Sequence, residues 1–247
     1  MIKYEKNNFF VSFKVEGFLL LTTTKEIIVQ NSLPLKECNV VIPYLTKEKC
    51  ISLYSFLTKY VDLFANKTIL MCEQIHGVNI IYANQKNVDF FSGILQINNS
   101  TVGYKIFFQS DGIISNSKQD IIAIFTADCI PLFVIDNKNK WFALVHVGRK
   151  GLQNGIVQHL FEKLFSLPSF SLKDTLFIVG PHICKDCYYV NGEKYSLVDI
   201  LFSQLKFFNI KHSQLIDTEI CTFHNKQFFS YRRDTTSYRA VSVITQL

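Results

Sequence analysis

The sequence predicts a single-domain α+β protein, because strand patterns and about three long helical patterns follow one another without a linker-like stretch. Two runs, Ile121–Phe125 and Trp141–Val147, are mostly apolar, which is typical of strands buried on both faces. After Gly151 the apolar residues recur every four positions, as on one face of a helix. The 247 residues are 48% hydrophobic and 19% charged, enough for a sizeable core. We therefore expect one domain over 1–247.

The first half of the chain is predicted to contain mostly strands and one long helix. Short apolar or β-branched runs predict strands at Phe9–Val15, Phe18–Thr23, Thr68–Cys72, Val78–Ala83, Tyr104–Phe108 and Gly112–Ser115. We expect the last two of these strands at sheet edges. Helical spacing covers Thr46–Phe64, whereas Asn31–Tyr44 is expected to be irregular and Asn84–Ser100 to form a polar surface loop.

The second half holds the segment that we expect to carry the chemistry. The first buried strand ends at Asp128-Cys129, and the second ends at His146-Val147-Gly148. Strand ends and strand-to-helix junctions are where α/β proteins usually place reactive side chains. Beyond this segment, the pattern predicts strands at Leu176–Val179, Tyr188–Val190 and Ala240–Ile244, and a helix over Glu193–Phe208.

Charge and hydropathy give little support to nucleic acid or membrane partners. The net charge of +6 is mild, and the basic residues are scattered rather than interleaved with aromatic residues in a stripe. The N-terminus lacks the cleavage site and apolar core of a signal peptide. No segment reaches the roughly 20 apolar residues of a membrane span. We expect a soluble, cytoplasmic protein that binds neither nucleic acid nor membranes.

The seven cysteines are predicted to be reduced, because an odd count without a secretion signal argues against a disulfide framework. Cys184-Lys185-Asp186-Cys187 is a lone CxxC. As a zinc half-site it lacks a second CxxC, and as a redox motif it lacks a helix-opening context. We interpret it as two reduced cysteines in a loop.

Three side chains form a candidate metal site: His76, Cys129 and His146. Two imidazoles and a thiolate suit zinc, and three protein ligands leave a fourth position open for water or substrate. Their wide separation along the chain matches no local finger motif. The alternative is that Cys129 is a buried apolar residue and His146 a hydrogen-bonded core histidine.

A series of motifs resembles one known family in order and content. They are QIHG at 74–77, DGIIS at 111–115, TADCIP at 126–131, HVGRKG at 146–151, GPHICKDCYYV at 180–190, CT at 221–222 and SYRRDTTSYR at 230–239. The sequence thereby resembles the laccase-domain, YfiH-like family, formerly labelled multi-copper polyphenol oxidoreductase and now described as purine nucleoside phosphorylases. The resemblance implies mixed β-sheets packed centrally with helices outside, and metal ligands at His76, Cys129 and His146.

The sequence departs from the family pattern in two places. Where the family reads HAGWRG, Arg149 replaces the tryptophan and Lys150 replaces the arginine. This change removes an aromatic ring for base stacking but keeps the basic character. The family's N-terminal Thr-Thr-Arg motif is represented at best by Thr22-Thr23-Thr24, which lacks the arginine.

The resemblance implies a zinc-dependent purine nucleoside phosphorylase that also deaminates adenosine. Its substrates would be adenosine, inosine, guanosine or methylthioadenosine together with phosphate. A zinc held by His76, Cys129 and His146 would activate water. We expect Asp128 to act as an acid/base or to support a metal ligand, or else to cap a loop.

Four further side chains are candidates for substrate binding. Arg232 or Arg233 offers paired donors to phosphate or ribose, and we expect only one of them in the site. Gln74 is a candidate for an amide contact with a purine edge. Lys150, next to a helix predicted to start near Leu152, is a candidate for holding phosphate, or else its side chain covers the helix start.

Other functions remain open at this point. A cysteine hydrolase would use Cys129 as nucleophile and His146 as base without a metal. The family has also been linked to editing of peptidoglycan precursors. A copper laccase is disfavoured, since the six histidines form no paired HxH clusters, so we expect zinc rather than copper. The oligomeric state is left open.

Overall fold

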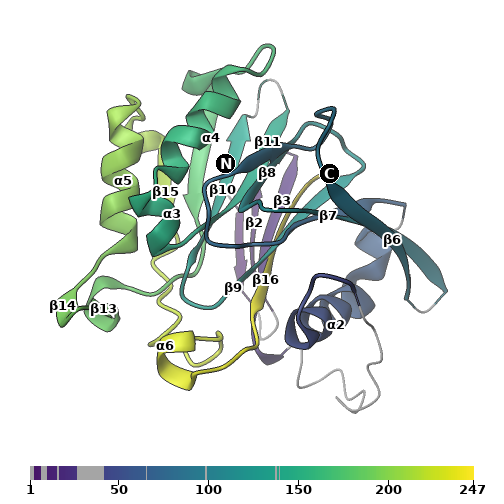
Figure 1. Cartoon of the computed structure of the whole chain (residues 1–247), viewed down its shortest axis with the longest axis horizontal. Helices are drawn as coiled ribbons and strands as arrows, with labels where there is room; N and C mark the ends of the chain where they lie inside the picture. The colour runs from purple at the N-terminus through teal and green to yellow at the C-terminus, as the bar shows by residue number, and fades with distance from the viewer. Residues whose placement is uncertain are drawn as a thin grey trace.

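Two large β-sheets lie face to face at the centre of the molecule, and helices cover their outer faces (Figure 1). The computed structural model describes residues 3–6, 10–15, 17–26, 42–64, 66–97, 99–136, 138 and 140–247. Within these residues, no helix is both long enough and apolar enough to cross a lipid bilayer.

The larger sheet places the ends of two parallel strands side by side. Its order is β1 (Lys3–Lys6), β2 (Phe10–Val15), β3 (Phe18–Thr23), β16 (Ala240–Gln246), β9 (Asp120–Thr126), β4 (Thr68–Cys72), β7 (Ser100–Phe107) and β6 (Phe90–Ile97). Strands β4 and β9 are parallel, with Ile69 opposite Ile121. Because parallel strands end at the same edge of a sheet, the segments that follow β4 and β9 start next to each other.

The smaller sheet fixes the register between the two strands that flank the predicted site. Its order is β15 (Leu215–Asp217), β12 (Thr175–Val179), β10 (Ile130–Asp136), β11 (Trp141–Val147), β8 (Gly112–Ser115) and β5 (Ile80–Tyr82). Strands β10 and β11 are antiparallel, with Ile130 opposite Val147 and Pro131 opposite His146. A separate hairpin joins β13 (Tyr189–Val190) to β14 (Glu193–Lys194).

Three apolar layers hold the helices and sheets together. One layer lies between the two sheets, and a second lies under α2 (Lys47–Phe64) on the outer face of the larger sheet. The third lies under α4 (Ile156–Phe165) and α5 (Leu197–Phe207) on the outer face of the smaller sheet. The protein is therefore α+β, with mixed sheets and outer helices, as the sequence predicts.

Most predicted elements are present, and several match closely. The helix expected over Thr46–Phe64 is α2, and the strand expected at Trp141–Val147 is β11. Positions 27–41, which include most of the segment predicted to be irregular, lie outside the described residues, as do Phe9 and Cys38.

Two predictions in the first half are wrong. The segment Asn84–Ser100, expected as a surface loop, contains β6, which pairs along its whole length with β7. β6 is mostly apolar, with exposed and less exposed residues alternating along most of it, and the polar residues before and after it concealed the strand. The strands expected at sheet edges are interior, since β7 lies between β4 and β6 and β8 lies between β11 and β5.

The helix expected after Gly151 is two helices. The first, α3 (Arg149–Gln153), begins right after Gly148, so the predicted start near Leu152 is wrong. The chain then breaks at Gly155, which adopts a left-handed conformation with φ of 89° before α4 begins. The spacing of apolar residues does not reveal such a break, because both helices bury apolar side chains in the same core layer.

Two further boundaries differ from the prediction. The strand β10 runs through Pro131 and was not predicted. The helix expected from Glu193 begins instead at Leu197, because Glu193 and Lys194 pair with the β13 strand.

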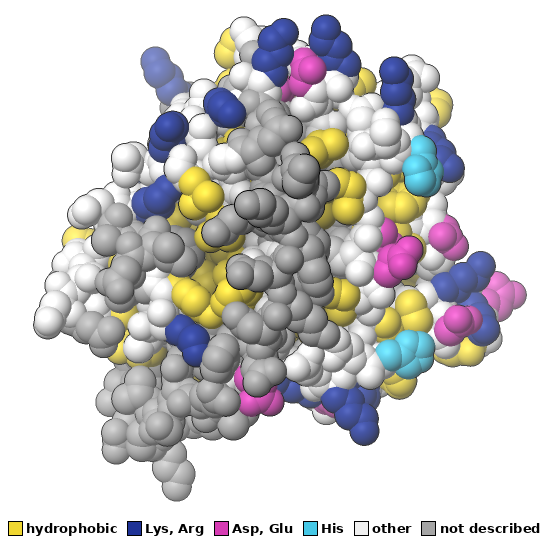
Figure 2. Space-filling model, turned by 180° about the vertical axis from the view of Figure 1, so that it is seen from behind, with side chains coloured by type: hydrophobic (Ala, Val, Ile, Leu, Met, Phe, Trp, Pro, Cys, Tyr) yellow, Lys and Arg dark blue, Asp and Glu magenta, His cyan; other side chains and the backbone are white. Residues whose placement is uncertain are grey.

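Charged side chains are dispersed on the face seen from behind. Figure 2 shows Lys and Arg side chains near the margins of this face, with Asp and Glu close to several of them. On this face, the described residues do not form the continuous basic stripe that a nucleic-acid-binding surface presents. The absence of a nucleic acid partner stays a prediction.

Candidate functional site

The three predicted metal ligands meet at the edge where the chain passes from one sheet to the other. The larger sheet's β9 ends at Thr126, and the chain enters β10 of the smaller sheet just after Cys129. The β10–β11 register then sets His146 beside the start of β10. His76 comes from the turn after β4, whose end adjoins that of β9. Strand pairing therefore assembles residues that are distant in sequence.

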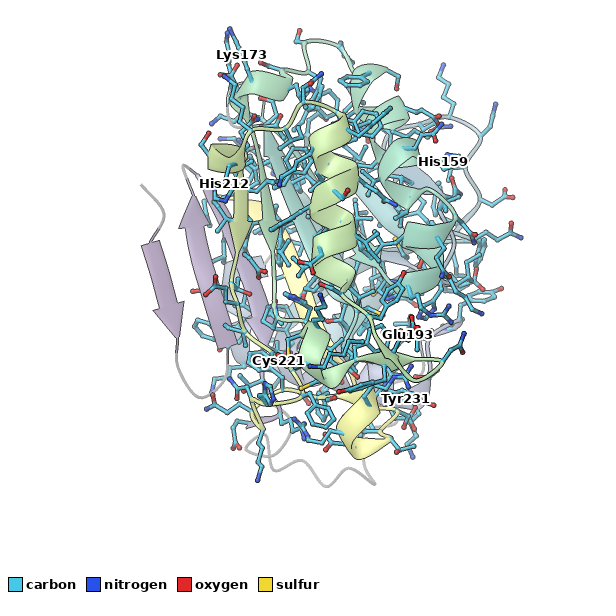
Figure 3. The ribbon with its side chains drawn as sticks, turned by 90° about the vertical axis from the view of Figure 1, so that its left-hand side faces the viewer. His159, Lys173, Glu193, His212, Cys221 and Tyr231 are labelled. Atoms are coloured by element: carbon cyan, nitrogen blue, oxygen red, sulfur yellow. The ribbon has the colours of Figure 1, made fainter. Side chains whose placement is uncertain are left out.

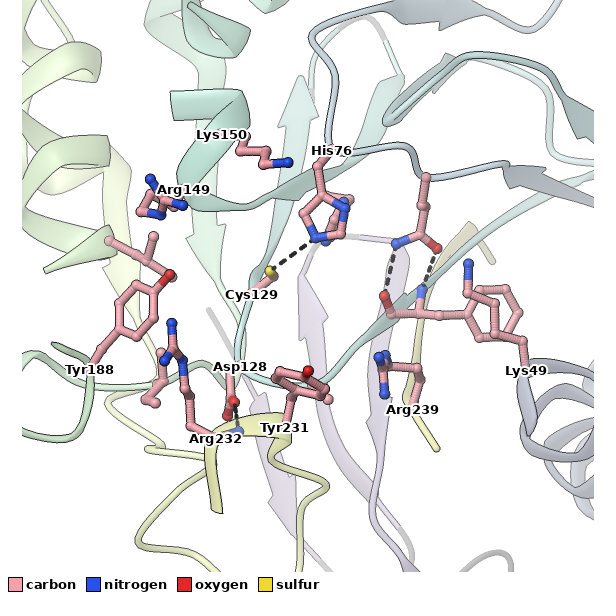
Figure 4. A pocket seen from close by; sticks show the side chains of 16 residues that line it. Lys49, His76, Asp128, Cys129, Arg149, Lys150, Tyr188, Tyr231, Arg232 and Arg239 are labelled. Carbon is pink, nitrogen blue, oxygen red and sulfur yellow. Dashed lines mark hydrogen bonds between the residues drawn. The ribbon is translucent and has the colours of Figure 1, made fainter. Parts of the chain in front are cut away.

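The side chains of this cluster are close enough to share one metal ion. The ligand atoms of His76, Cys129 and His146 all lie within 4.8 Å of one another. The Cys129 sulfur is 4.0 Å from Nε2 of His76, and the two imidazole rings meet edge to face with centroids 4.7 Å apart (Figure 4). His146 is buried and His76 is exposed, so the cluster opens to one side. A nitrogen and sulfur donor set of this kind suits zinc.

Asp111 orients this cluster and was not predicted as a site residue. Its buried carboxylate accepts the backbone N–H groups of His76 at 3.0 Å and Gly77 at 2.7 Å. Its Oδ1 also lies 2.8 Å from Nδ1 of His146. Because a carboxylate has no proton to donate, Nδ1 of His146 is the donor, which leaves Nε2 as the nitrogen that can bind a metal. A carboxylate behind a histidine ligand holds the ring and raises its basicity in this way.

The cluster favours a thiolate at Cys129. Burial raises the pKa of the Cys129 thiol, but the charge of His146 and hydrogen bonds from both histidines outweigh it and lower the pKa to about 6. Burial lowers the pKa of His146, but the Cys129 thiolate and the Asp111 hydrogen bond raise it to about 9. Thiolate is the form of cysteine that binds metal and the form that acts as a nucleophile.

The backbone around the cluster is tightly constrained. Gln74, His76 and Asp128 adopt positive φ values of 61°, 61° and 91°. Non-glycine residues rarely adopt this conformation, and it typically costs on the order of 1–3 kcal/mol unless the surrounding structure enforces it. At Gly148, an added Cβ would lie 3.1 Å from Cδ2 of His76 and 3.2 Å from the sulfur of Cys129. Only glycine lets the chain pass this close to both ligands.

Gly148→Ala is therefore expected to weaken metal binding without unfolding the protein. The new methyl group must displace His76 or Cys129 by a few tenths of an ångström, which would spoil the geometry that a bound metal ion requires. Retention of added zinc against a chelator measures the effect, and we expect faster loss than in the wild type. Gly103→Ala is the control, because its Cβ would meet only ordinary contacts at 3.6 Å and beyond. Equal retention in both variants would contradict this account.

A cavity of about 540 Å³ opens from the cluster and is rich in basic and aromatic side chains (Figure 4). Its basic lining residues are Lys49, Arg149, Lys150, Arg232 and Arg239. Three aromatic rings, Phe125, Tyr188 and Tyr231, also line it, whereas Asp128 is the one carboxylate in the lining. The cavity is therefore suited to an anionic group and a flat ring together.

The basic and aromatic side chains are partly stacked on one another. The guanidinium of Arg232 lies over the ring of Tyr188 at 4.8 Å, and the ammonium of Lys49 lies over Phe125 at 5.4 Å. Burial lowers the pKa of Lys49, and the charge of Arg239 lowers it further. Cation–π contacts of this kind hold a charged group in place without neutralising it.

Sequence reasoning missed several lining residues. Arg149, Tyr188, Tyr231 and Arg239 all lie within family-like motifs, at positions for which no substrate role was predicted. Their place in these motifs was a usable signal. Lys49 lies on α2, and no sequence pattern pointed to it.

Lys150 and Arg232 line the cavity, but Arg233 does not. The guanidinium of Arg233 donates to the carbonyl oxygens of Thr222, Phe223 and Phe228 and pairs with Asp234. These contacts use its donors, so the structure corrects the prediction of Arg233 as a substrate-binding candidate. The expectation that only one of the two arginines faces the site agrees with their placement.

Gln74 lines the cavity, as predicted, but its amide is bonded to the backbone. Its amide nitrogen donates to the carbonyl oxygen of Phe125 at 2.8 Å, and its amide oxygen accepts the Phe125 N–H at 2.9 Å. This pair continues the β4–β9 pairing beyond the end of β4, as a strand partner would. The predicted contact of the amide with a purine stays a prediction.

Asp128 contacts the C-terminal segment rather than the metal cluster. Its carboxylate oxygens accept from the Thr222 hydroxyl and from the Arg232 backbone N–H, both at 2.7 Å. The second bond caps the first turn of α6 (Tyr231–Asp234). This bonding matches the loop-capping alternative for Asp128. It also links Asp128, the neighbour of Cys129, to Arg232 in the cavity lining.

Comparison with known proteins gives one family and several relatives. The sequence model of the family described as multi-copper polyphenol oxidoreductase laccase matches residues 54–199 and 192–246. A protein named purine nucleoside phosphorylase from Campylobacter jejuni is 32% identical over 150 residues, which cover 54% of this chain and 66% of that protein. One of the same name from Clostridium acetobutylicum is 28% identical over 156 residues, covering 54% of this chain and 65% of its own length. The chain thus matches just under two thirds of the length of these relatives.

Solved structures share the fold across the whole chain. YlmD from Geobacillus stearothermophilus superposes with a TM-score of 0.73 at 17% identity and covers 100% of this chain and 99% of its own. The YfiH protein of Bacillus licheniformis gives a TM-score of 0.76 at 17% identity, with 99% of both chains covered. At this identity, the likeness establishes the fold alone.

Proposed function

The chain belongs to the family described as multi-copper polyphenol oxidoreductase laccase, and we propose that it is a zinc-dependent purine nucleoside phosphorylase. In this proposal adenosine, inosine, guanosine or methylthioadenosine reacts with phosphate to give the free base and a ribose 1-phosphate product. Deamination of adenosine is a side activity of the same site. The observation that carries the proposal is a two-histidine, one-cysteine cluster facing a basic and aromatic cavity. The names of the relatives support the reaction class.

The metal in this proposal is zinc, held by His76, Cys129 and His146. Three protein ligands with nitrogen and sulfur donors leave a coordination position open, the arrangement of catalytic zinc sites. A multi-copper site would require further clusters of histidines, whereas the described residues that line the cavity include two histidines, His76 and His146. When bound, zinc would supply Lewis-acid activation of water.

The basic side chains of the cavity would bind phosphate. Arg232 offers a planar pair of donors, and Lys150 adds a mobile ammonium from the first turn of α3. Both lie with the cluster around one cavity, as the attack of phosphate on a bound nucleoside requires (Figure 4). Holding the two reactants together in this way converts an encounter in solution into a reaction within one complex.

The aromatic side chains would hold the purine. Tyr188 and Tyr231 offer ring faces and hydroxyl groups in the same cavity, and Phe125 offers a third ring. They would take over the base stacking that the replacement of tryptophan by Arg149 removes. In the proposal Asp128 positions Arg232 through its backbone N–H. An acid/base role for Asp128 in deamination stays a prediction.

The experiment that tests this function is a phosphate-dependence assay. Inosine or adenosine is given to the pure protein, and free base and ribose 1-phosphate are measured with and without phosphate. We expect both products only when phosphate is present. Base release without phosphate would identify a nucleoside hydrolase instead. Turnover of a cell-wall precursor without turnover of any nucleoside would move the function to peptidoglycan editing.

A second candidate is a cysteine hydrolase that uses no metal. The observation that favours it is the lowered pKa of Cys129, at about 6, next to His146 and its Asp111 partner. A thiolate, an imidazole and an orienting carboxylate are the parts of such a site. Full activity of metal-free protein, lost when Cys129 is alkylated, would favour this candidate over the phosphorylase.

A further inference from the structure

A second group of metal-binding side chains lies outside the cavity. Cys184, Cys187, Cys221 and His224 have their ligand atoms within 4.8 Å of one another. The sulfur of Cys184 is 3.8 Å from Nδ1 of His224, and the sulfur of Cys187 is 3.1 Å from Nε2 of the same ring. We propose that these four residues hold a second, structural zinc ion. This inference does not rest on the proposed function.

The donor set fits zinc in a closed site. Three thiolates and one imidazole fill all four positions of a tetrahedral zinc ion, which is the composition of structural rather than catalytic sites. With zinc–sulfur bonds of about 2.3 Å, the sulfur atoms of a tetrahedral site lie roughly 3.8 Å apart, within the 4.8 Å that bounds all ligand atoms of this cluster. Binding requires each thiol to release its proton to solvent, so three protons leave as the ion enters.

The backbone brings the two ligand pairs together independently of any metal. Strands β12 and β15 are parallel, with Val179 opposite Asp217, so the loops that follow them start at the same edge. A bridge then joins the loops, because His182 N–H donates to the Ile220 carbonyl and Thr222 N–H donates to the His182 carbonyl. The ligands are thus preorganised by pairing that the sheet imposes.

Two neighbouring contacts support the proposed ligand cluster. The Cys184 N–H donates to the sulfur of Cys221 at 3.4 Å, a contact that favours thiolate. The guanidinium of Arg233 donates to the carbonyl oxygens of Thr222 and Phe223, both at 2.7 Å. These bonds hold the backbone between Cys221 and His224 in place, while Asp234 balances the charge of the guanidinium. The contacts also account for an arginine that the cavity does not use.

The second half of this proposed site has a spacing that the sequence pattern did not reveal. Cys184 and Cys187 were interpreted as reduced loop cysteines because no second CxxC follows them, and both are free thiols in the structure. The partner pair in the proposal is Cys221-Thr222-Phe223-His224, a CxxH.

The proposed zinc would brace one wall of the cavity. The Arg232 guanidinium stacks on the ring of Tyr188, and Tyr188 directly follows Cys187 in the chain. Thr222, which lies between the ligands Cys221 and His224, donates its hydroxyl to Asp128. Figure 3 shows Cys221 and Tyr231 near the same end of the molecule, below α5. The four ligands are positioning residues, since none of them lines the cavity.

Metal content and cobalt spectra of the full chain test this proposal. Under reducing conditions, we expect two zinc equivalents in the wild type and one in Cys129→Ala. In that single-site background, Co²⁺ should give the intense sulfur-to-metal absorption of a three-thiolate site. His224→Ala, placed in the same background, should lose the remaining zinc to a chelator at least 10-fold faster.

Two variants make this test specific. His224→Cys should restore zinc retention and shift the cobalt spectrum, because four thiolates then surround the ion. His212→Ala, another exposed histidine, is the matched control and should retain zinc like its parent. The proposal is overturned if the Cys129→Ala protein holds no zinc, or if His224→Ala retains it unchanged. A Cys184–Cys187 disulfide in reduced preparations, seen as a mass lower by two hydrogens, would overturn it as well.

Discussion

Replacement of Cys129 by alanine is expected to remove one zinc equivalent and lower phosphorolysis by more than about 100-fold. The expected loss exceeds the roughly 10- to 100-fold range typical of changes to residues that hydrogen-bond to a metal ligand, because this substitution removes a ligand itself. The fold should be kept, since the cysteine lies at a strand junction and two large sheets carry the core. Zinc content, steady-state kinetics and circular dichroism of the same preparation measure the three effects.

Two further variants calibrate this result. Asp111→Asn keeps the shape of the side chain but weakens the support of His146, so we expect a 10- to 100-fold loss of zinc affinity. Cys50→Ala removes a buried thiol on α2 outside the cluster and should leave zinc content unchanged. If the Cys129→Ala protein kept the wild-type rate of phosphorolysis, the proposed metal site could not be the catalytic site.

Removal of the ammonium of Lys150 is expected to weaken phosphate binding selectively. A charge-assisted hydrogen bond contributes about 1.5–3 kcal/mol, which corresponds to a roughly 10- to 150-fold higher phosphate KM in Lys150→Ala. The nucleoside KM should change much less, because the aromatic rings of the cavity would hold the base. Kinetics in which phosphate and nucleoside are varied separately measure the two constants.

The matched variants for this prediction are Arg232→Ala and Lys173→Ala. Arg232 lines the same cavity, so its loss should also raise the phosphate KM. Lys173 is exposed on another part of the surface, and its replacement should leave both constants unchanged. An unchanged phosphate KM in Lys150→Ala with a raised one in Arg232→Ala would assign the anion to the arginine alone.

The sequence by itself determined the elements whose patterns are local. Continuous apolar runs identified β9 and β11, and helical spacing identified α2. Burial on one or two faces requires apolar residues at regular positions, so it can be recognised from the sequence alone. Ligand chemistry likewise singled out His76, Cys129 and His146 from single residues. What the sequence could not supply was their distance from one another, which depends on pairing between segments far apart in the chain.

Tertiary structure decided the features that no local pattern encodes. The register of β10 against β11 and the parallel pairing of β4 with β9 bring the three ligands together, and the same folding sets Asp111 behind His146. Gln74 lines the cavity as predicted, but the bonding of its amide to the Phe125 backbone depends on the β4–β9 pairing and left no sign in the sequence.

The same distinction holds for the cysteine pair at 184 and 187. Its chemistry was visible in the sequence, but its partners Cys221 and His224 follow a different strand and meet it only through the β12–β15 pairing. Side-chain chemistry belongs to single residues and can be read directly, whereas a site is a set of distances fixed by strand pairing and burial over the whole chain.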